Sequence, residues 1–330
     1  MASPPARAVA WTAAGAAAAA LPLVASNPAT VNIGVFTLMY VGLASAWNIL
    51  GGYTGYISLG NAAAFGIGAY TLGLLLNGLH VPAGFLPFAY VPLAGLVTVI
   101  LTAPLGWVAL RTRAATFVIV TIAEMFVVQL LASNLRGLTQ GSQGLGLPVP
   151  SWGPQFFPVP YYYAMFVLAA GTVGLSAWVR RSKFGLGLLA IRDDEDKAST
   201  LGIPARTFMI AAYVISVLPV GMIGAVYAYY VTYIYPQFVV DPLIDIGMAL
   251  MVFLGGMGTL AGPVVGAVIL QPAQQYLAYR YGAAQLYLIL YSAVFLSVLL
   301  LMPQGIVPEI GSRLQHRSGG EPAAVATPDR

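Results

Sequence analysis

Apolar stretches of about 20 residues recur along nearly the whole chain, and they restrict its fold more than any single motif does. A helix rises about 1.5 Å per residue, so it needs roughly 20 apolar residues to cross about 30 Å of hydrocarbon. Hydrophobic residues make up 59% of the chain and charged residues 7%, which lies far outside soluble globular composition. The sequence therefore predicts an all-α, polytopic helical membrane protein with no soluble domain.

The candidate spans follow one another from the N-terminal region to about residue 302. They lie near residues 8–25, 31–50, 62–79, 88–110, 114–133, 161–179, 207–233, 243–257, 259–277 and 283–302. This pattern predicts about ten transmembrane helices, with eight or nine as alternatives. The Ala-rich residues 8–25 could instead be a signal peptide, but Leu23 is a poor residue three places before a cut at Ala25.

Basic residues fall mainly on one side of these spans. With the N-terminus inside, ten spans place twelve of the 14 lysines and arginines in the cytoplasm and leave Arg136 and Arg280 outside. Such an excess marks the cytoplasmic side, so both termini are predicted to be cytoplasmic. Residues 1–317 would form the transmembrane domain, and the polar residues 318–330 a disordered cytoplasmic tail.

Residues 183–206 form the one long charged segment inside this apolar chain, with eight of its 24 charged residues. Acidic residues 193–196 suit the first turn of a helix, and Gly202 followed by Pro204 suits its end, which predicts a helix of about ten residues. Its apolar positions could form a small stripe for a partner: Ile191, Ala198 and Leu201. The residues alone allow two interpretations, a docking surface for a soluble partner and an ordinary charged cytoplasmic loop.

Two glycine-rich stretches, residues 51–70 and 255–263, lie at membrane depth. Glycine permits broken helices, and nearby polar side chains such as Ser58 and Asn61 can satisfy the backbone groups that a break exposes. Paired discontinuous segments often mark a translocation path, whereas for any single glycine tight helix packing is the better explanation. The candidate path residues are Gly55, Ser58, Gly60, Asn61, Gly256 and Gly258.

Glu124 is the one ionisable residue within the clearest spans, where a carboxylate costs about 3 kcal/mol on insertion scales. It could serve the path, or it could be neutral and bonded to Gln129 or Thr121. No Gly-Lys-Ser/Thr phosphate loop is present, and there are no cysteines. His80 and His316 lie in a loop and the tail, away from any catalytic arrangement, so the chain is not predicted to be an enzyme.

At these motifs the chain resembles the permease subunits of bacterial branched-chain amino acid ABC importers, in particular the M-type membrane subunit of the leucine/isoleucine/valine system. The resemblance covers roughly residues 31–310. Five stretches match in order: Gly55 to Tyr70, Phe117 to Ala123, Phe184 to Gly202, Gly255 to Pro263, and Pro303 to Ile306. It implies a type II ABC-importer-like permease fold and a multi-pass protein of the bacterial inner membrane.

The resemblance also implies a role for residues 183–206 as the segment that couples the membrane helices to an ATP-binding subunit. The coupling residues would be Arg192, Asp193, Asp194, Glu195, Ala198, Leu201 and Gly202. The implied partners are a paralogous second permease, two ATP-binding subunits and an extracytoplasmic solute-binding protein. No cofactor is implied for this chain, because ATP would be bound by the partner subunits.

The chain departs from the family pattern at three places. Asn61 stands where the family usually has histidine, the run 196–200 is more polar than usual, and Glu124 lies two places before the usual acidic position. A family role therefore is not carried over to Glu124. Urea, short-amide or sugar permeases of the same superfamily remain alternatives, and a secondary transporter driven by an ion gradient is a further one.

Overall fold

The computed structural model describes residues 4–25, 27–281, 292–293, 296 and 305–309. Long helices dominate this part of the chain. They are α1 (Pro4–Val24), α2 (Pro28–Trp47), α3 (Asn61–Gly78), α4 (Val91–Ala109), α5 (Ala114–Asn134), α7 (Pro158–Arg181), α10 (Ala205–Val231), α12 (Pro242–Gly255) and α13 (Gly262–Tyr281).

Shorter elements connect the long helices. They are the π-helical turn η1 (Asn48–Gly52), the 3-10 turns η2 (Leu86–Tyr90) and η3 (Gly141–Gln143), and the helices α6 (Arg136–Thr139), α8 (Lys183–Asp193), α9 (Glu195–Thr200) and α11 (Pro236–Val239). Two strands, β1 (Leu145–Gly146) and β2 (Tyr233–Ile234), pair antiparallel with Leu145 opposite Ile234. This pairing ties the long connection after α5 to the end of α10.

Every span predicted up to residue 277 falls on one of these helices. Within the described residues, six helical segments are long and apolar enough to cross a membrane: Pro28–Gly52, Leu86–Ala109, Ala114–Asn134, Pro158–Arg181, Ala205–Val231 and Pro236–Gly255. The fold class is thus confirmed as polytopic and helical. The predicted span 283–302 lies almost wholly outside the described residues, and the predicted tail 318–330 lies entirely outside them.

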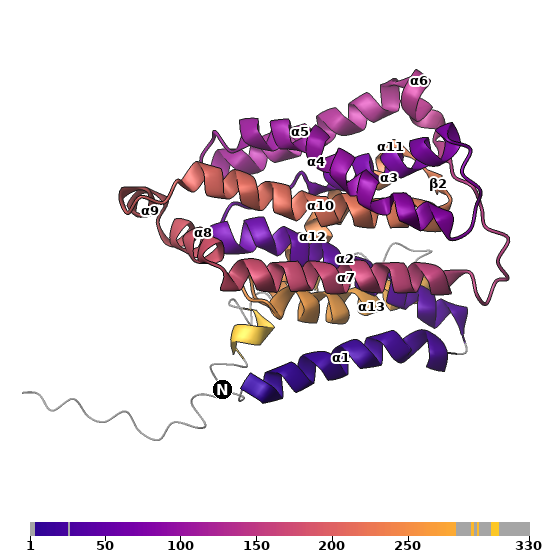
Figure 1. Cartoon of the computed structure of the whole chain (residues 1–330), viewed down its shortest axis with the longest axis horizontal. Coiled ribbons are helices and arrows are strands. Elements are labelled where there is room, and N and C mark those ends of the chain that lie inside the picture. The colour runs from indigo at the N-terminus through magenta and orange to yellow at the C-terminus, as the bar shows by residue number, and fades with distance from the viewer. Residues whose placement is uncertain (1–3, 26, 282–291, 294–295, 297–304, 310–330) are drawn as a thin grey trace, which may run out of the picture.

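The long helices run side by side along the long axis of the molecule (Figure 1). Helix α10 is central and packs against α2, α3, α4 and α7. The short helices α8 and α9 lie at one end of the bundle, and α6 and β2 lie at the other (Figure 1). We call the end with α8 and α9 the basic end, because Arg111 and Arg206 both stack there on the Trp107 ring, at 3.8 and 5.4 Å.

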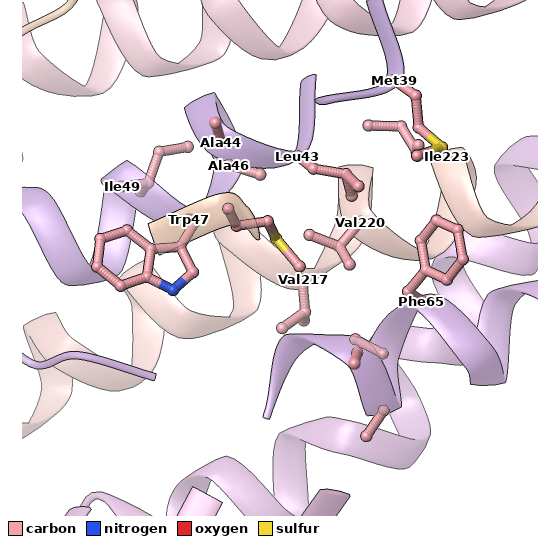
Figure 2. Close-up of a cluster of buried hydrophobic side chains, with 14 of the residues drawn as sticks. Met39, Leu43, Ala44, Ala46, Trp47, Ile49, Phe65, Val217, Val220 and Ile223 are labelled. Atoms are coloured by element: carbon pink, nitrogen blue, oxygen red, sulfur yellow. The ribbon is translucent and has the colours of Figure 1, made fainter. Parts of the chain in front are cut away.

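The core lies where α2, α3 and α10 meet. Leu43 and Trp47 of α2, Phe65 of α3 and Val220 of α10 are buried there among other apolar side chains (Figure 2). Helices α3 and α10 come very close, since a Cβ added at Gly68 would overlap the backbone of Gly221. Small residues at such crossings are the usual means of close packing between membrane helices.

Helices α1 and α5 lie at the edges of the bundle (Figure 1). Helix α1 packs on α7, where the Tyr162 hydroxyl donates a 2.6 Å hydrogen bond to the carbonyl of Ala18. Only Phe117, Thr121 and Met125 of α5 are buried. Its exposed apolar side chains face outward from this chain; they are Ile119, Phe126, Val127, Leu130 and Leu131.

Candidate translocation path and coupling segment

The two glycine-rich interruptions predicted from the sequence are real breaks between helices. The first break, residues 51–60, begins at the end of the π-helical turn η1 that follows α2, stays helical to Thr54 and is non-helical from Gly55 to Gly60, before α3. The second break, residues 255–262, separates α12 from α13. Gly256 and Gly258 there have φ of +118° and +76°, which residues with a side chain rarely adopt.

The Asn48 side chain joins the two breaks. Its Oδ1 accepts a 2.9 Å hydrogen bond from the Gly258 N–H, and its Nδ2 donates a 2.9 Å bond to the Thr259 carbonyl. Asn48 is fully buried, and a Cβ added at Gly52 would overlap its amide. Because both ends of the buried amide are satisfied, the two breaks form one hydrogen-bonded unit.

Helix α3 begins within the bundle, directly after the first break. The Ser58 hydroxyl accepts a 3.3 Å hydrogen bond from the Gly60 N–H, and the Thr121 hydroxyl of α5 accepts a 3.1 Å bond from the Leu59 N–H. The Ser58 hydroxyl thus accepts a hydrogen bond from a backbone group that the break exposes. The side-chain amide that bonds backbone groups of the second break is that of Asn48.

A buried carboxyl group accepts a hydrogen bond from the first turn of α3. Asp245, in the first turn of α12, is 1% exposed, and its Oδ2 accepts a 3.0 Å hydrogen bond from the Ala62 N–H. Among the described residues its Oδ1 has no hydrogen-bond partner. Asn61, the first residue of α3, is buried beside this contact. Asp245 was not predicted as a site residue, because it lies close to the start of the short span 243–257.

Glu124 lies apart from this contact, part-way along α5. Its Oε1 accepts a long hydrogen bond, 3.4 Å, from the Tyr213 hydroxyl of α10. The partners considered from the sequence are wrong, because both bond elsewhere: Gln129 donates to the Val240 carbonyl and Thr121 to the Val118 carbonyl. Glu124 is half-buried, on the helix that exposes most of its surface.

The charged segment 183–206 folds as two short helices rather than the one of about ten residues that the sequence predicted. Asp194 separates α8 from α9, because its Oδ1 accepts a 2.9 Å hydrogen bond from the Lys197 N–H and so begins α9. That bond and the Lys197 ammonium, 3.0 Å away, lower the pKa of Asp194. Asp193 is exposed at the end of α8, and Gly202, with φ of +86°, follows the end of α9.

The predicted apolar stripe of this segment is wrong. Ile191 and Ala198 are 3% and 2% exposed, because they pack into the hydrophobic core. Leu201 is 80% exposed. Of the three, only Leu201 is therefore available to a partner.

Two hydrogen bonds tie this segment to the first break. The Tyr56 hydroxyl donates a 2.6 Å bond to Glu195 of α9, and the Arg192 guanidinium donates a 2.8 Å bond to the Gly52 carbonyl. Burial, reinforced by Glu195, raises the pKa of Tyr56, so its hydroxyl remains a donor. A cavity of about 300 Å³ lies between these contacts. It is lined by Thr54, Gly55, Tyr56, Arg113, Ala114, Ile191, Arg192, Glu195 and Asp196.

The structure thus brings the glycine-rich breaks and part of the charged segment into one site at the basic end. Gly258 lies against Arg192 and Gly55 lines the same cavity, whereas Glu124 and Leu201 take no part in this site. Sequence reasoning missed Asn48, Tyr56 and Asp245. Asn48 had a signal, a polar side chain in an apolar span just before the glycine run.

Comparison with known proteins bears directly on this site. Residues 29–299 match the family model described as branched-chain amino acid transport system / permease component. The high-affinity branched-chain amino acid transport system permease protein LivM of Salmonella typhimurium (strain LT2) is 26% identical over 316 residues, which cover 88% of this chain and 72% of that protein. LivM of Escherichia coli (strain K12) is 25% identical with the same coverage.

A second kind of permease protein is also similar. The high-affinity branched-chain amino acid transport system permease protein LivH of Salmonella typhimurium (strain LT2) is 24% identical over 296 residues, which cover 82% of this chain and 92% of that protein. No solved structure shows a significant match. Because the family model spans most of the sequence, the chain belongs to the branched-chain amino acid transport system permease component family, and its role is that of a membrane permease.

Proposed function

We propose that the chain is the permease subunit of an ATP-driven importer that receives branched-chain or related hydrophobic amino acids from an extracytoplasmic binding protein. The observation that carries this proposal is the hydrogen-bonded contact between segment 183–206 and the first break, through Tyr56 and Glu195. A partner that moves this segment would act directly on a helix interruption. In a stand-alone channel or carrier such a contact would have no evident use.

The proposed assembly contains a second, paralogous permease and two ATP-binding subunits besides the binding protein. The similarity of the chain to both LivM and LivH supports a paired permease. The exposed apolar side chains of α5 offer the second permease an apolar face. Each permease would then supply half of the translocation path.

The orientation follows from charge. Arg111 and Arg206 gather at the basic end together with segment 183–206, so this end is assigned to the cytoplasm of a bacterial cell with the binding protein on the opposite side. In the scheme of ten spans, both termini lie in the cytoplasm. ATP would be bound and hydrolysed by the partner subunits, since this sequence has no Gly-Lys-Ser/Thr phosphate loop.

The path itself would be lined by small and apolar groups near the start of α3. Gly60, Ser58 and Asn61 are buried there, and Gly256 and Gly258 form the adjoining second break. A substrate delivered by a binding protein and driven by ATP needs no tight site in the membrane, because tight binding would slow its release. We therefore assign substrate selectivity mainly to the binding protein.

The test is uptake by the complete complex in liposomes. The chain is co-expressed with the permease, ATP-binding and binding-protein genes that neighbour its own, and uptake of labelled leucine is measured with ATP inside the vesicles. Uptake should require ATP and the binding protein, and excess isoleucine or valine should compete. Competition by urea or ribose in place of leucine would support the other solute classes. The purified chain alone should hydrolyse no ATP.

One observation favours a second candidate, a transporter driven by an ion gradient. The structure places a second carboxylate, Asp245, inside the bundle in addition to Glu124. Buried carboxylates in membrane proteins often serve proton or cation pathways. Uptake that persists without ATP and collapses when ionophores remove the proton and sodium gradients would establish this candidate and exclude the first.

A further inference from the structure

Arg192 is an exposed residue whose guanidinium is held by a hydrogen bond within this chain. It lies in the last turn of α8, yet its Nη1 donates a 2.8 Å hydrogen bond back to the Gly52 carbonyl of η1. Gly52 belongs to the turn that ends α2, where carbonyl groups have lost their helical partners. A guanidinium is always charged, and it suits the negative end of a helix.

The same side chain also contacts the second break. A Cβ added at Gly258 would overlap Nη1 of Arg192, and one added at Gly55 would lie 3.5 Å from its Cγ. The arginine stem therefore passes Gly55, and its head lies between Gly52 and Gly258. Any larger residue at position 258 would occupy the space of the guanidinium.

The two breaks that Arg192 contacts are also linked to each other. Asn48 bonds the second break through the N–H of Gly258 and the carbonyl of Thr259. Arg192 thus contacts both breaks, which are already joined by hydrogen bonds. By contrast, the Tyr56 to Glu195 bond connects α9 to the first break alone.

We propose that Arg192 is the residue through which movement of segment 183–206 is passed to both helix breaks. It is a positioning residue: it contacts neither the transported solute nor, through its bonded Nη1, a docked subunit. The inference rests on the proposed function, because it assumes that a partner moves the segment. It differs from the family-based expectation, in which Arg192 belongs to the docking surface.

The test compares variants in the complete complex in liposomes, with assembly, ATP hydrolysis and uptake measured on the same preparation. In Arg192→Gln, assembly and ATP hydrolysis should stay near the parent level, while uptake per ATP falls roughly tenfold, as expected for loss of a charged hydrogen bond. Arg192→Lys should restore part of the coupling. Its ammonium can donate to one carbonyl but lacks the planar, forked donor geometry of a guanidinium. Arg181→Gln, at an exposed arginine that ends α7, is the control and should leave coupling unchanged.

In the comparison of Arg192 variants, two results would overturn the proposal. Unchanged uptake per ATP in Arg192→Gln would show that the contact transmits nothing. Loss of ATP-binding subunits from the Arg192→Gln complex would instead make Arg192 a docking residue.

A second measurement examines the contact without using transport. Thermal unfolding of the detergent-purified chain is compared for Gly258→Ala in the parent and in an Arg192→Ala background. The loss of stability should be smaller in the second background, because the overlap with Nη1 is gone and what remains is the positive φ and a 2.9 Å approach to the Gly52 carbonyl oxygen. Strictly additive losses would exclude the contact and overturn the inference, with the proposed function intact.

Absence of ATP-driven uptake in the parent complex would overturn the proposed function and with it the transmission role, but it would leave the result of the stability cycle unaffected.

Discussion

The Asp245 carboxylate accepts a hydrogen bond from the Ala62 N–H at 3.0 Å, although the two residues lie 183 positions apart in the chain. The bond places a carboxyl oxygen at the N-terminus of α3, where the helix dipole is positive and backbone N–H groups lack helical partners. It also joins the first turn of α3 to the first turn of α12. The helix after the first break and the helix before the second break are therefore held together away from the basic end as well.

Removing this carboxylate should destabilise the start of α3. Asp245→Ala is expected to lower the free energy of unfolding by about 0.5–2 kcal/mol, the usual effect of losing a helix cap. Asp245→Asn should lose less, because its amide oxygen can still accept the Ala62 N–H. Thermal unfolding in detergent measures both, with Asp193→Ala as the exposed control. Equal losses in the Asn and Ala variants would show that charge, and not the hydrogen bond, is what matters.

Asn48 should be far less replaceable than an exposed asparagine. Asn48→Leu leaves the Gly258 N–H and the Thr259 carbonyl without their partner, and each buried unsatisfied group costs about 1–3 kcal/mol. The matched control is Asn77→Leu, which removes an exposed bond to the Gly146 carbonyl. Denaturant or thermal unfolding of the two variants should separate them clearly. Similar stabilities would contradict the view that the breaks form one unit.

Gly60 should tolerate no large side chain, because a Cβ there would lie 2.9 Å from the Thr121 carbonyl oxygen. We expect Gly60→Leu to abolish uptake more than it lowers expression, and Gly256→Leu to do the same. Gly78→Leu is the control, since a Cβ at that position meets nothing within 4 Å. Transport assays normalised to membrane protein measure the effect. Normal uptake after both substitutions would remove these glycines from the path.

Leu201 and Ala198 should respond differently to aspartate. Leu201→Asp changes a side chain that is 80% exposed, so it should weaken docking of the ATP-binding subunit while insertion stays intact. Ala198→Asp buries a charge at a site 2% exposed and should instead unfold α9. Cysteine crosslinking from residues 193–202 to the ATP-binding subunit reports docking, and protease sensitivity of segment 183–206 reports unfolding of α9. The two measurements together separate the two effects. Crosslinks that never reach that subunit would refute the docking surface.

Glu124 should prove dispensable for recognition of the solute. Glu124→Gln keeps the oxygen that accepts the long bond from Tyr213 and removes only the charge. On the weak-site argument we expect roughly half or more of the transport to remain. Uptake assays with quantified complex assembly provide the measurement. Complete loss of uptake in a normally assembled complex would place a functional carboxylate in the path.

The helices could be predicted from the sequence because their signals are local. Apolar runs bounded by Pro, Gly and charged residues determine where α2 to α13 begin and end, and the glycine runs mark the two breaks. Asp194 and Gly202 likewise act on their immediate neighbours, so the sequence placed them correctly near the two ends of a short helix. The length predicted for that helix, about ten residues, was wrong.

The contacts of the site could not be predicted, because they depend on which helices become neighbours. Nothing near Asp245 in the sequence indicates that it bonds Ala62, and nothing near Arg192 indicates that it reaches Gly258. The burial of a side chain likewise depends on which helices become neighbours. Ala198 and Leu201 look alike as apolar positions in a charged segment, yet only the packing of α9 on the bundle decides that one is covered.

The link between Asn48 and the second break also has a consequence for biosynthesis. Gly258 emerges from the ribosome 210 residues after Asn48, which at typical elongation rates corresponds to roughly 10–40 s. Until then the amide of Asn48 lies in the membrane without its native partners. The N-terminal half of the permease therefore reaches its final arrangement only after the C-terminal half has been made.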